Sequence, residues 1–146
     1  MVPAGYYAIL WTDDEGSVLV RFPQHPGVNT FGRDQEEAEN MAREALNVAL
    51  ESDFERAVKL PALRKPRAGE GERVVMVPLD ADVRMAYVLR EWREDAGFTQ
   101  QEMAARLGVS YQAYQRMERP GRSNLTVATL DRIARALQRE LVIAVQ

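Results

Sequence analysis

Cysteine is absent from the 146 residues, and histidine occurs only once, as His25. The lack of cysteine excludes disulfides and thiolate metal sites, and one imidazole is too few for a zinc site built from histidines. His25 lies in the turn sequence Pro-Gln-His-Pro-Gly, where we expect a solvated loop side chain. We therefore predict that the protein holds no metal ion.

Long apolar runs are also missing. No segment approaches the roughly 18 apolar residues that span a bilayer, and the N-terminus lacks a charged segment followed by an apolar core. The composition, with 46% hydrophobic and 28% charged residues, is that of a soluble globular protein. We expect a cytoplasmic protein without membrane contact, long enough for one medium domain or two small ones.

Catalytic motifs are missing as well: there is no Gly-rich phosphate loop, no Gly-x-Ser-x-Gly elbow and no paired metal-ligand spacing. Asp13, Asp14 and Glu15 are adjacent carboxylates, and convergent acidic groups can hold magnesium for phosphodiester cleavage. Consecutive positions on a tight turn point apart, however, so a nuclease is the weakest of the functions considered. We expect no catalytic residues and no cofactor.

The segment 99–118, TQQEMAARLGVSYQAYQRME, has the spacing of two short helices joined by a tight turn. Thr99 can cap the first helix and form a capping box with Glu102. Gly108 tolerates the left-handed conformation that ends a helix, and Ser110 can cap the second helix. The segment therefore predicts a helix-turn-helix.

The outer face of the second helix carries side chains suited to reading DNA. We expect Gln112 and Arg116 to contact bases, because a glutamine amide can pair bidentately with adenine and a guanidinium with guanine in the major groove. Thr99 and Gln100, at the start of the first helix, would hold a phosphate. The alternative is an ordinary helical hairpin with a solvated polar face. The positions of the second helix expected at the DNA are Ser110, Tyr111, Gln112, Ala113, Gln115 and Arg116.

Helical patterns flank this segment, since apolar residues recur at helical spacing over 82–96 and 126–137. Four short helices would form one small bundle. The segments FTQQEMAARLGVSYQAYQRMER and NLTVATLDRIARAL resemble the lambda-repressor-like (XRE-type) helix-turn-helix family. The resemblance implies an internal ion pair between Arg93 and Glu118, on the first and third helices. It also implies DNA-facing positions for Gln100, Gln112 and Arg116.

The first half predicts a small α+β domain. Strands are expected at 6–11, 17–22, 29–31 and 72–79, the first two joined by a turn at 13–16. Asp34 can cap a helix that runs to about residue 53, with Glu37 as the returning carboxylate. Small and apolar residues of this helix fall on one stripe, which we expect to pack on the sheet. Residues 60–71, rich in proline, glycine and basic side chains, predict a loop.

Charge is divided unevenly between the expected domains, 1–80 and 81–146. Residues 1–80 hold 9 Lys and Arg against 14 Asp and Glu, a net charge of −5, whereas residues 81–146 hold 10 against 8, a net of +2. A net of +2 is weak for binding DNA as a monomer, so we expect dimerisation. The alternating apolar segment 141–145 predicts a strand that pairs with a second copy. The acidic half would attract a basic partner. The alternative is that the difference in net charge between the two halves arises by chance.

The whole order of motifs resembles the HicB family of antitoxins. The matching segments are YYAILWTDDEGSVLVRFPQHPGVNTFGRDQEEAENMAREALNVALES, LPALRKP and RVVMVPL. In that family a partial RNase-H-like fold without its catalytic acids masks a HicA-type ribonuclease toxin, while a C-terminal module binds the operon's own promoter. The resemblance implies an antitoxin that represses its own operon by binding double-stranded operator DNA as a homodimer or higher homo-oligomer.

If the first domain masks a toxin, aromatic and acidic side chains of the hairpin are the candidate contacts. The aromatic candidates, Trp11 and Phe22, are equally compatible with a place in the core. The alternative function is a stand-alone helix-turn-helix regulator whose first domain senses a small ligand. The candidate toxin-binding residues are Trp11, Asp13, Asp14, Glu15 and Phe22.

Overall fold

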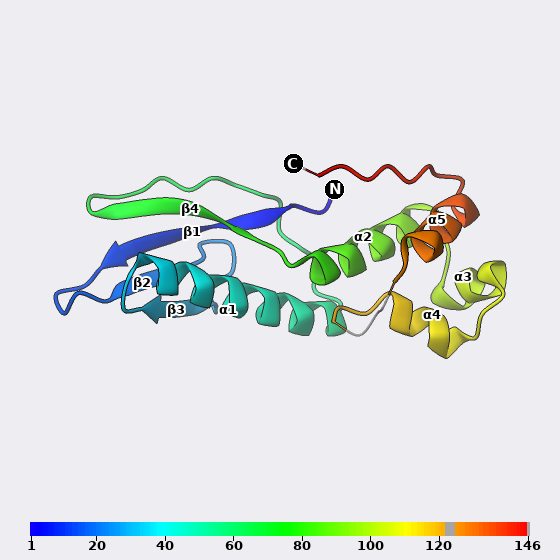
Figure 1. The fold of residues 1–146 in the computed structure, drawn as a ribbon, viewed down its shortest axis with the longest axis horizontal. Coiled ribbons are helices and arrows are strands. Elements are labelled where there is room, and N and C mark those ends of the chain that lie inside the picture. The colour runs from blue at the N-terminus through cyan, green and yellow to red at the C-terminus, as the bar shows by residue number, and fades with distance from the viewer. Residues whose placement is uncertain (122–124, 146) are drawn as a thin grey trace. The chain divides into compact units, whose positions relative to one another are not determined.

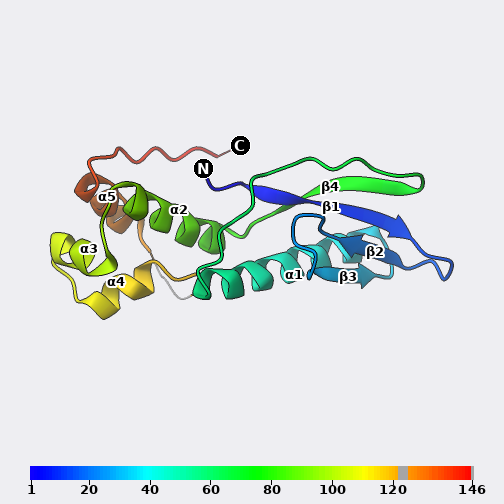
Figure 2. The same cartoon turned by 180° about the vertical axis from the view of Figure 1, so that it is seen from behind.

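The computed structural model describes residues 1–121 and 125–145. The chain folds into two compact units, Val2–Arg84 and Met85–Gln146, with Met1 assigned to the second. The first unit is a small antiparallel sheet with one long helix and the second is helical (Figures 1 and 2). Helix α2 (Ala81–Asp95) begins in the first unit and continues into the second. The predicted α+β fold class, a small sheet domain followed by a helix-turn-helix domain, is confirmed.

One antiparallel sheet, in the order β3-β2-β1-β4, forms the first unit. The predicted hairpin is present, with Leu10 of β1 opposite Val20 of β2. Its turn is closed by the Asp13 carboxylate, which accepts hydrogen bonds from the backbone N–H groups of Glu15 and Ser17 at 3.0 and 2.9 Å. The strands are β1 (Gly5–Thr12), β2 (Val18–Arg21), β3 (Asn29–Gly32) and β4 (Glu72–Pro78).

Helix α1 (Gln35–Glu55) covers one face of the sheet and ends two residues later than predicted. Asp34 caps it by accepting from the Glu37 N–H at 2.9 Å, but the Glu37 carboxylate returns to the Arg33 N–H and not to that of Asp34. The helix lies very close to β3, because a Cβ on Gly32 would be 2.3 Å from the backbone nitrogen of Ala38. The inward stripe is fully buried and consists of Ala38, Ala42, Leu46 and Leu50.

The segment 56–71, between α1 and β4, forms no helix or strand but is anchored near its middle. The Tyr6 hydroxyl donates to the Pro61 carbonyl at 2.7 Å. The Gln24 side chain donates to the Ala62 carbonyl and accepts from the Arg64 N–H at 2.9 Å. The predicted loop is therefore tied to β1 and to the turn after β2.

His25 is buried, contrary to the expectation of a solvated side chain. It is 9% exposed, and its ring lies edge-on to Tyr6 with the ring centroids 4.5 Å apart. Its Nε2 atom makes no hydrogen bond with any described residue. Burial lowers the pKa of His25, and the Asp53 carboxylate acts in the opposite direction. The sequence predicts the turn correctly. It does not predict that the His25 side chain points inward, because that depends on packing against Tyr6.

The second unit is the predicted four-helix bundle. It contains α2, α3 (Gln100–Leu107), α4 (Tyr111–Met117) and α5 (Val127–Ala136). Helices α2 and α5 lie within one residue of their predicted bounds. The buried core consists of Leu89, Met103, Ala104, Tyr114, Ile133 and Leu137.

Residues 141–145 form no secondary structure in the single chain, and their apolar side chains lie in solvent. Val142, Ile143 and Val145 are 80, 61 and 96% exposed. Pairing of this segment with a second copy stays a prediction. Among the described residues, no helix combines the length and the apolar character needed to cross a membrane.

Candidate nucleic-acid interface

Local hydrogen bonds fix the turn between α3 and α4. The Thr99 side chain accepts from the Glu102 N–H at 3.1 Å, and the Glu102 carboxylate accepts from the Thr99 N–H at 3.4 Å, which is the predicted capping box. Gly108 ends α3 with a φ of 68°, a conformation that costs glycine little. The Ser110 side chain then accepts from the Ala113 N–H at 3.1 Å and starts α4. Thr99 and Ser110 thus have structural roles as helix caps.

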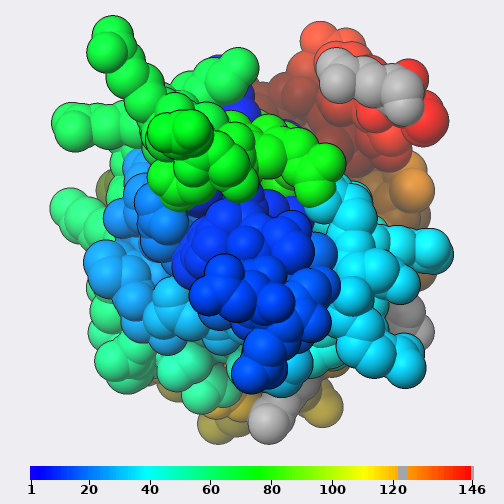
Figure 3. Space-filling view, turned by 90° about the vertical axis from the view of Figure 1, so that its left-hand side faces the viewer, coloured from blue at the N-terminus to red at the C-terminus, as the bar shows by residue number. Residues whose placement is uncertain are grey.

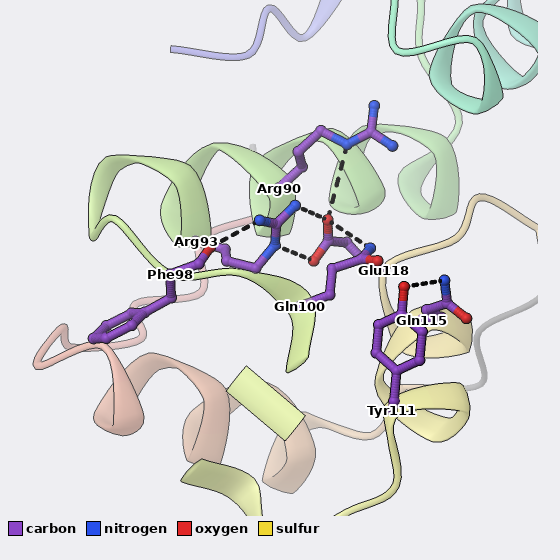
Figure 4. A network of polar contacts seen from close by, with 7 residues as sticks. All are labelled: Arg90, Arg93, Phe98, Gln100, Tyr111, Gln115 and Glu118. Carbon is purple, nitrogen blue, oxygen red and sulfur yellow. Dashed lines mark hydrogen bonds and ion pairs between the residues drawn. The ribbon is translucent and has the colours of Figure 1, made fainter. Parts of the chain in front are cut away.

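A buried ion pair holds the end of α4 against α2 (Figure 4). Glu118 is 0% exposed, and its two oxygens accept from Nε and Nη2 of Arg93 at 2.9 and 2.8 Å. Arg93 also donates from Nη1 to the Phe98 carbonyl at 2.9 Å, so three of its donors are occupied. The hydrogen bond with Glu118 raises the pKa of Arg93. The structure thus brings together the two residues whose pairing the family resemblance implied.

Arg90 is a further cation near this carboxylate that the sequence analysis missed. Its Nε lies 3.8 Å from Oε1 of Glu118. Burial lowers the pKa of Arg90, and Glu118 acts in the opposite direction. The spacing of three residues to Arg93 places both guanidinium groups on one side of α2, and this i, i+3 signal was available in the sequence.

Gln100 joins the same network from the start of α3 (Figure 4). Its Nε2 donates to Oε1 of Glu118 at 3.4 Å. One amide hydrogen of Gln100 is therefore committed to the ion pair, and the other is left for an external acceptor such as a phosphate. The buried pair in this way orients a residue that the sequence analysis assigned to the DNA backbone.

The outer face of α4 presents free hydrogen-bonding groups. Tyr111, Gln112 and Arg116 are exposed, and Ala113 is half-buried. Gln115 donates from Nε2 to the Tyr111 hydroxyl at 2.9 Å, as Figure 4 shows. Gln112 and Arg116 make no hydrogen bond or ion pair with any described residue. Their amide and guanidinium are therefore available to base edges.

Comparison with known proteins agrees with this geometry. A model of the helix-turn-helix family HTH_3 matches residues 89–143. Over 133 residues the sequence is 33% identical to Antitoxin HicB 1 of Photorhabdus laumondii, an alignment that covers 91% of this chain and 81% of that protein. This chain belongs to the HicB antitoxin family.

Other similarities cover one part of the chain each. An uncharacterized HTH-type transcriptional regulator of Methanothermobacter thermautotrophicus is 43% identical over 56 residues, which is 38% of this chain and 80% of that protein. The crystal structure of the N-terminal domain of Burkholderia pseudomallei antitoxin HicB aligns with a TM-score of 0.45 and 22% identity, over 51% of this chain and 96% of that one. The relatives with which this HicB-family chain shares sequence are thus an antitoxin and a transcriptional regulator by name.

The acidic turn of the first unit divides its carboxylates between structure and solvent. Asp13 is committed to the turn, whereas Asp14 and Glu15 are exposed and form no ion pair with any described residue. No group of three or more His, Asp or Glu side chains within 1–121 and 125–145 is placed to hold a metal ion. Of the three acidic candidates for toxin binding, only Asp14 and Glu15 have free carboxylates.

The two aromatic candidates occupy different environments. Phe22 is 1% exposed and lies in the core, which corrects its assignment as a contact residue, because a ring enclosed by the core cannot reach a partner. Trp11 is half-buried, and the guanidinium carbon of Arg21 lies 5.0 Å from its ring centroid. Arg21 is not among the residues expected at a partner, although its position two strand residues beyond Leu19 puts it on the same sheet face.

Proposed function

We propose that this chain is the antitoxin of a type II toxin–antitoxin system. Its first unit masks a HicA-type ribonuclease toxin, and its second unit represses the operon that encodes both proteins. The observation that carries the proposal is the similarity to Antitoxin HicB 1 along 91% of the chain, which includes both units. The open outer face of α4 supports the second activity.

DNA binding is proposed to follow from the way α4 is held. Gly108 and the cap at Ser110 fix the turn, and Ser110 and the ion pair at Glu118 fix the two ends of α4. A helix fixed in this way can enter the major groove with its first turn deepest. Gln112 would then meet base edges, with Arg116 one turn further along and the free amide hydrogen of Gln100 on a phosphate.

Substitution on the outer face tests this part. Gln112→Ala and Arg116→Ala should each weaken binding to the promoter by about 1 to 3 kcal/mol at fixed salt, with a smaller effect on nonspecific DNA. Arg135→Ala is the matched control, because Arg135 is an exposed arginine of α5 that pairs with Asp131. Full operator affinity and unchanged base preference in both α4 variants would show that α4 is not the reading helix.

The first unit is proposed to act on the toxin through charge and contact together. It holds 10 Lys and Arg against 15 Asp and Glu over residues 2–84, a net charge of −5. Such a unit can replace the RNA backbone as the counter-charge of a cationic RNA-binding surface. Inhibition should therefore be competitive with RNA and should weaken only in part with salt, because apolar contacts supply the centre of a lasting interface.

Titration of the full chain into an RNA-cleavage reaction of the toxin tests the antitoxin function. Cleavage should stop at saturation, and Gln112→Ala and Arg116→Ala should inhibit as well as the unaltered chain, because DNA binding is not required. Uninhibited cleavage together with intact promoter binding would favour the alternative, a stand-alone regulator with a ligand-sensing first unit. A groove of about 580 Å³ in the first unit, lined in part by His25, Asp53, Arg56 and Lys59, is the place for such a ligand.

A second copy of the chain is part of the proposal. The second unit holds 9 Lys and Arg against 7 Asp and Glu over residues 85–146, and a net of +2 gives one copy little attraction to DNA. The exposed segment 141–145 offers unpaired backbone groups to the same segment of a second copy. Truncation after Glu140 keeps the contact between Arg139 and Asp95 and should yield monomers in sedimentation. An unchanged oligomer with unchanged promoter affinity would reject this interface.

A further inference from the structure

The sheet of the first unit carries an apolar row on the face that α1 leaves open. Trp11 of β1 lies opposite Leu19 of β2, and Leu19 lies opposite Phe31 of β3. Side chains alternate along a strand, and the neighbour of Phe31, Gly32, is the residue in close contact with α1. Trp11, Leu19 and Phe31, which we call the aromatic row, therefore point away from α1.

Ile9 of the same face is buried, so this face meets solvent only in part. Where it does, an apolar row is unusual, because polar side chains are the norm on the solvent face of an antiparallel sheet. Phe31 is 62% exposed and lies on the edge strand β3, and Trp11 and Leu19 are half-buried. Arg21, on the same face, lies over the Trp11 ring and places Nη2 2.7 Å from the Glu72 carboxylate. Tryptophan and arginine held together in this way are typical of residues that dominate protein interfaces.

Carboxylates lie at the end of the sheet next to the row. Trp11 also pairs across the sheet with Glu72, so the turns at 13–16 and 69–71 lie at the same end. Figure 3 looks onto this end of the first unit, with β1 and its turn in blue below β4 in green. Asp14, Glu15 and Glu70 are exposed there without ion pairs to any described residue. The surface thus has an apolar centre and an acidic rim, the anatomy of a protein interface.

We propose that the aromatic row is the docking surface for the toxin, with Phe31 and Trp11 at the centre of contact and Asp14 and Glu15 on the rim. The inference rests on the proposed antitoxin function and adds the residues that carry it. Charge selects the occupant, because a ribonuclease surface that binds RNA is cationic and complements the rim. A second copy of this acidic unit, with its net charge of −5, would instead meet repulsion.

The chain provides a matched pair of exposed apolar residues for the test. Phe31 is 62% exposed on the open sheet face, and Val48 is 67% exposed on the outer side of α1. Phe31→Lys removes the ring and places a positive charge against a cationic partner, so the Kd for the full chain and the purified HicA-type toxin should rise at least tenfold. Val48→Lys should change that Kd less than twofold. Both variants should keep the circular dichroism spectrum and promoter affinity of the unaltered chain, since both positions are at the surface.

A second variant tests the rim separately from the centre. The double substitution Asp14→Asn and Glu15→Gln should slow association several-fold at low salt and leave dissociation nearly unchanged, because rim charges act mainly on encounter. If the unaltered chain and Phe31→Lys bind the toxin equally well, the aromatic row is not the docking surface. That result would leave the antitoxin function standing. Loss of binding in Val48→Lys alone would move the surface to α1 and overturn the inference as well. Failure of the unaltered chain to bind the toxin would reject the proposed function itself.

Discussion

The two units differ in the kind of polar group that they bury. The helical unit buries a full charge, Glu118, and surrounds it with Arg93, Arg90 and the Gln100 amide. The sheet unit buries only neutral groups, of which Asn47 and His25 are the most enclosed. Its carboxylates and guanidinium groups lie at or near the surface, some in exposed or half-buried pairs and others, such as Asp14 and Glu15, without an ion pair to any described residue.

The difference shows how each unit sets its functional surface. In the helical unit the buried charge reaches the start of α3 and the end of α4, so that the pair orients the elements expected at DNA. In the sheet unit strand register sets the surface, and no buried ion pair among its described residues takes part. We therefore expect the helical unit to be sensitive to loss of one charge and the sheet unit to be sensitive to acid.

Loss of the buried charge should have the largest effect. Glu118→Ala removes the buried carboxylate that Arg93 binds through two hydrogen bonds, so the free energy of unfolding of the second unit should fall by about 3 to 5 kcal/mol. Urea unfolding followed by Trp92 fluorescence in a Trp11→Phe background measures it, because each unit holds one of the two tryptophans. Asp131→Ala, which breaks an exposed pair with Arg135, is the control and should cost less than about 1 kcal/mol. Equal losses in both variants would remove the contrast between buried and exposed charge.

Asn47 is the corresponding test in the sheet unit and should cost less. Its side chain donates to the carbonyls of Arg43 and Pro78 at 2.8 and 3.3 Å and accepts from the Asp80 N–H at 2.7 Å. Asn47→Ala removes the acceptor of the Asp80 N–H and the donor to the two carbonyls, and about 1 to 3 kcal/mol should be lost from the first unit. Trp11 fluorescence in a Trp92→Phe background follows this unfolding. A loss above that of Glu118→Ala would contradict the ranking of the two interiors.

The helical unit could be predicted almost completely from the sequence, because its determinants are local. The capping box at Thr99, the left-handed Gly108 and the cap at Ser110 each depend on residues within four positions. Helix periodicity likewise gave the bounds of α2 and α5 within one residue. The pairing of Arg93 with Glu118 is not local, and it followed only from the family resemblance.

In the sheet unit the elements were predictable but the surfaces were not. Trp11 lies in β1 and Phe22 directly follows β2, yet Phe22 is buried and Trp11 lies on the face away from α1 with Arg21. A shift of one position in a strand reverses the face of every side chain, so the strand register must be known before a surface can be assigned. The burial of His25 depends on Tyr6, 19 positions away, and no local pattern indicates that contact.

Acid should destabilise the sheet unit through His25. Its pKa is lowered by burial in the folded state, so the unfolded state binds a proton first as the pH falls below about 6.5. Neutral His25 therefore makes its full contribution to the free energy of unfolding above that pH, and the contribution is lost as the pH falls below it. Between pH 6.5 and 5.5 the loss is no more than about 1.4 kcal/mol. Urea unfolding of the Trp92→Phe chain across this range measures the slope, and His25→Phe, which cannot be protonated, should flatten it. An equal slope in both chains would assign the acid effect to other groups.

The smallest change in the free energy of unfolding is expected from Tyr114→Phe. This substitution tests whether the Tyr114 hydroxyl belongs to the buried polar network of the helical unit. Tyr114 is 0% exposed, and its hydroxyl makes no hydrogen bond with any described residue. Burial and the nearby Glu118 raise the pKa of this hydroxyl, so it stays protonated throughout the stable range. Because an unpaired buried hydroxyl contributes little, its removal should change the free energy of unfolding by less than about 1 kcal/mol, in either direction. Trp92 fluorescence in the Trp11→Phe background measures it, and a loss above about 2 kcal/mol would show that Tyr114 belongs to the Glu118 network.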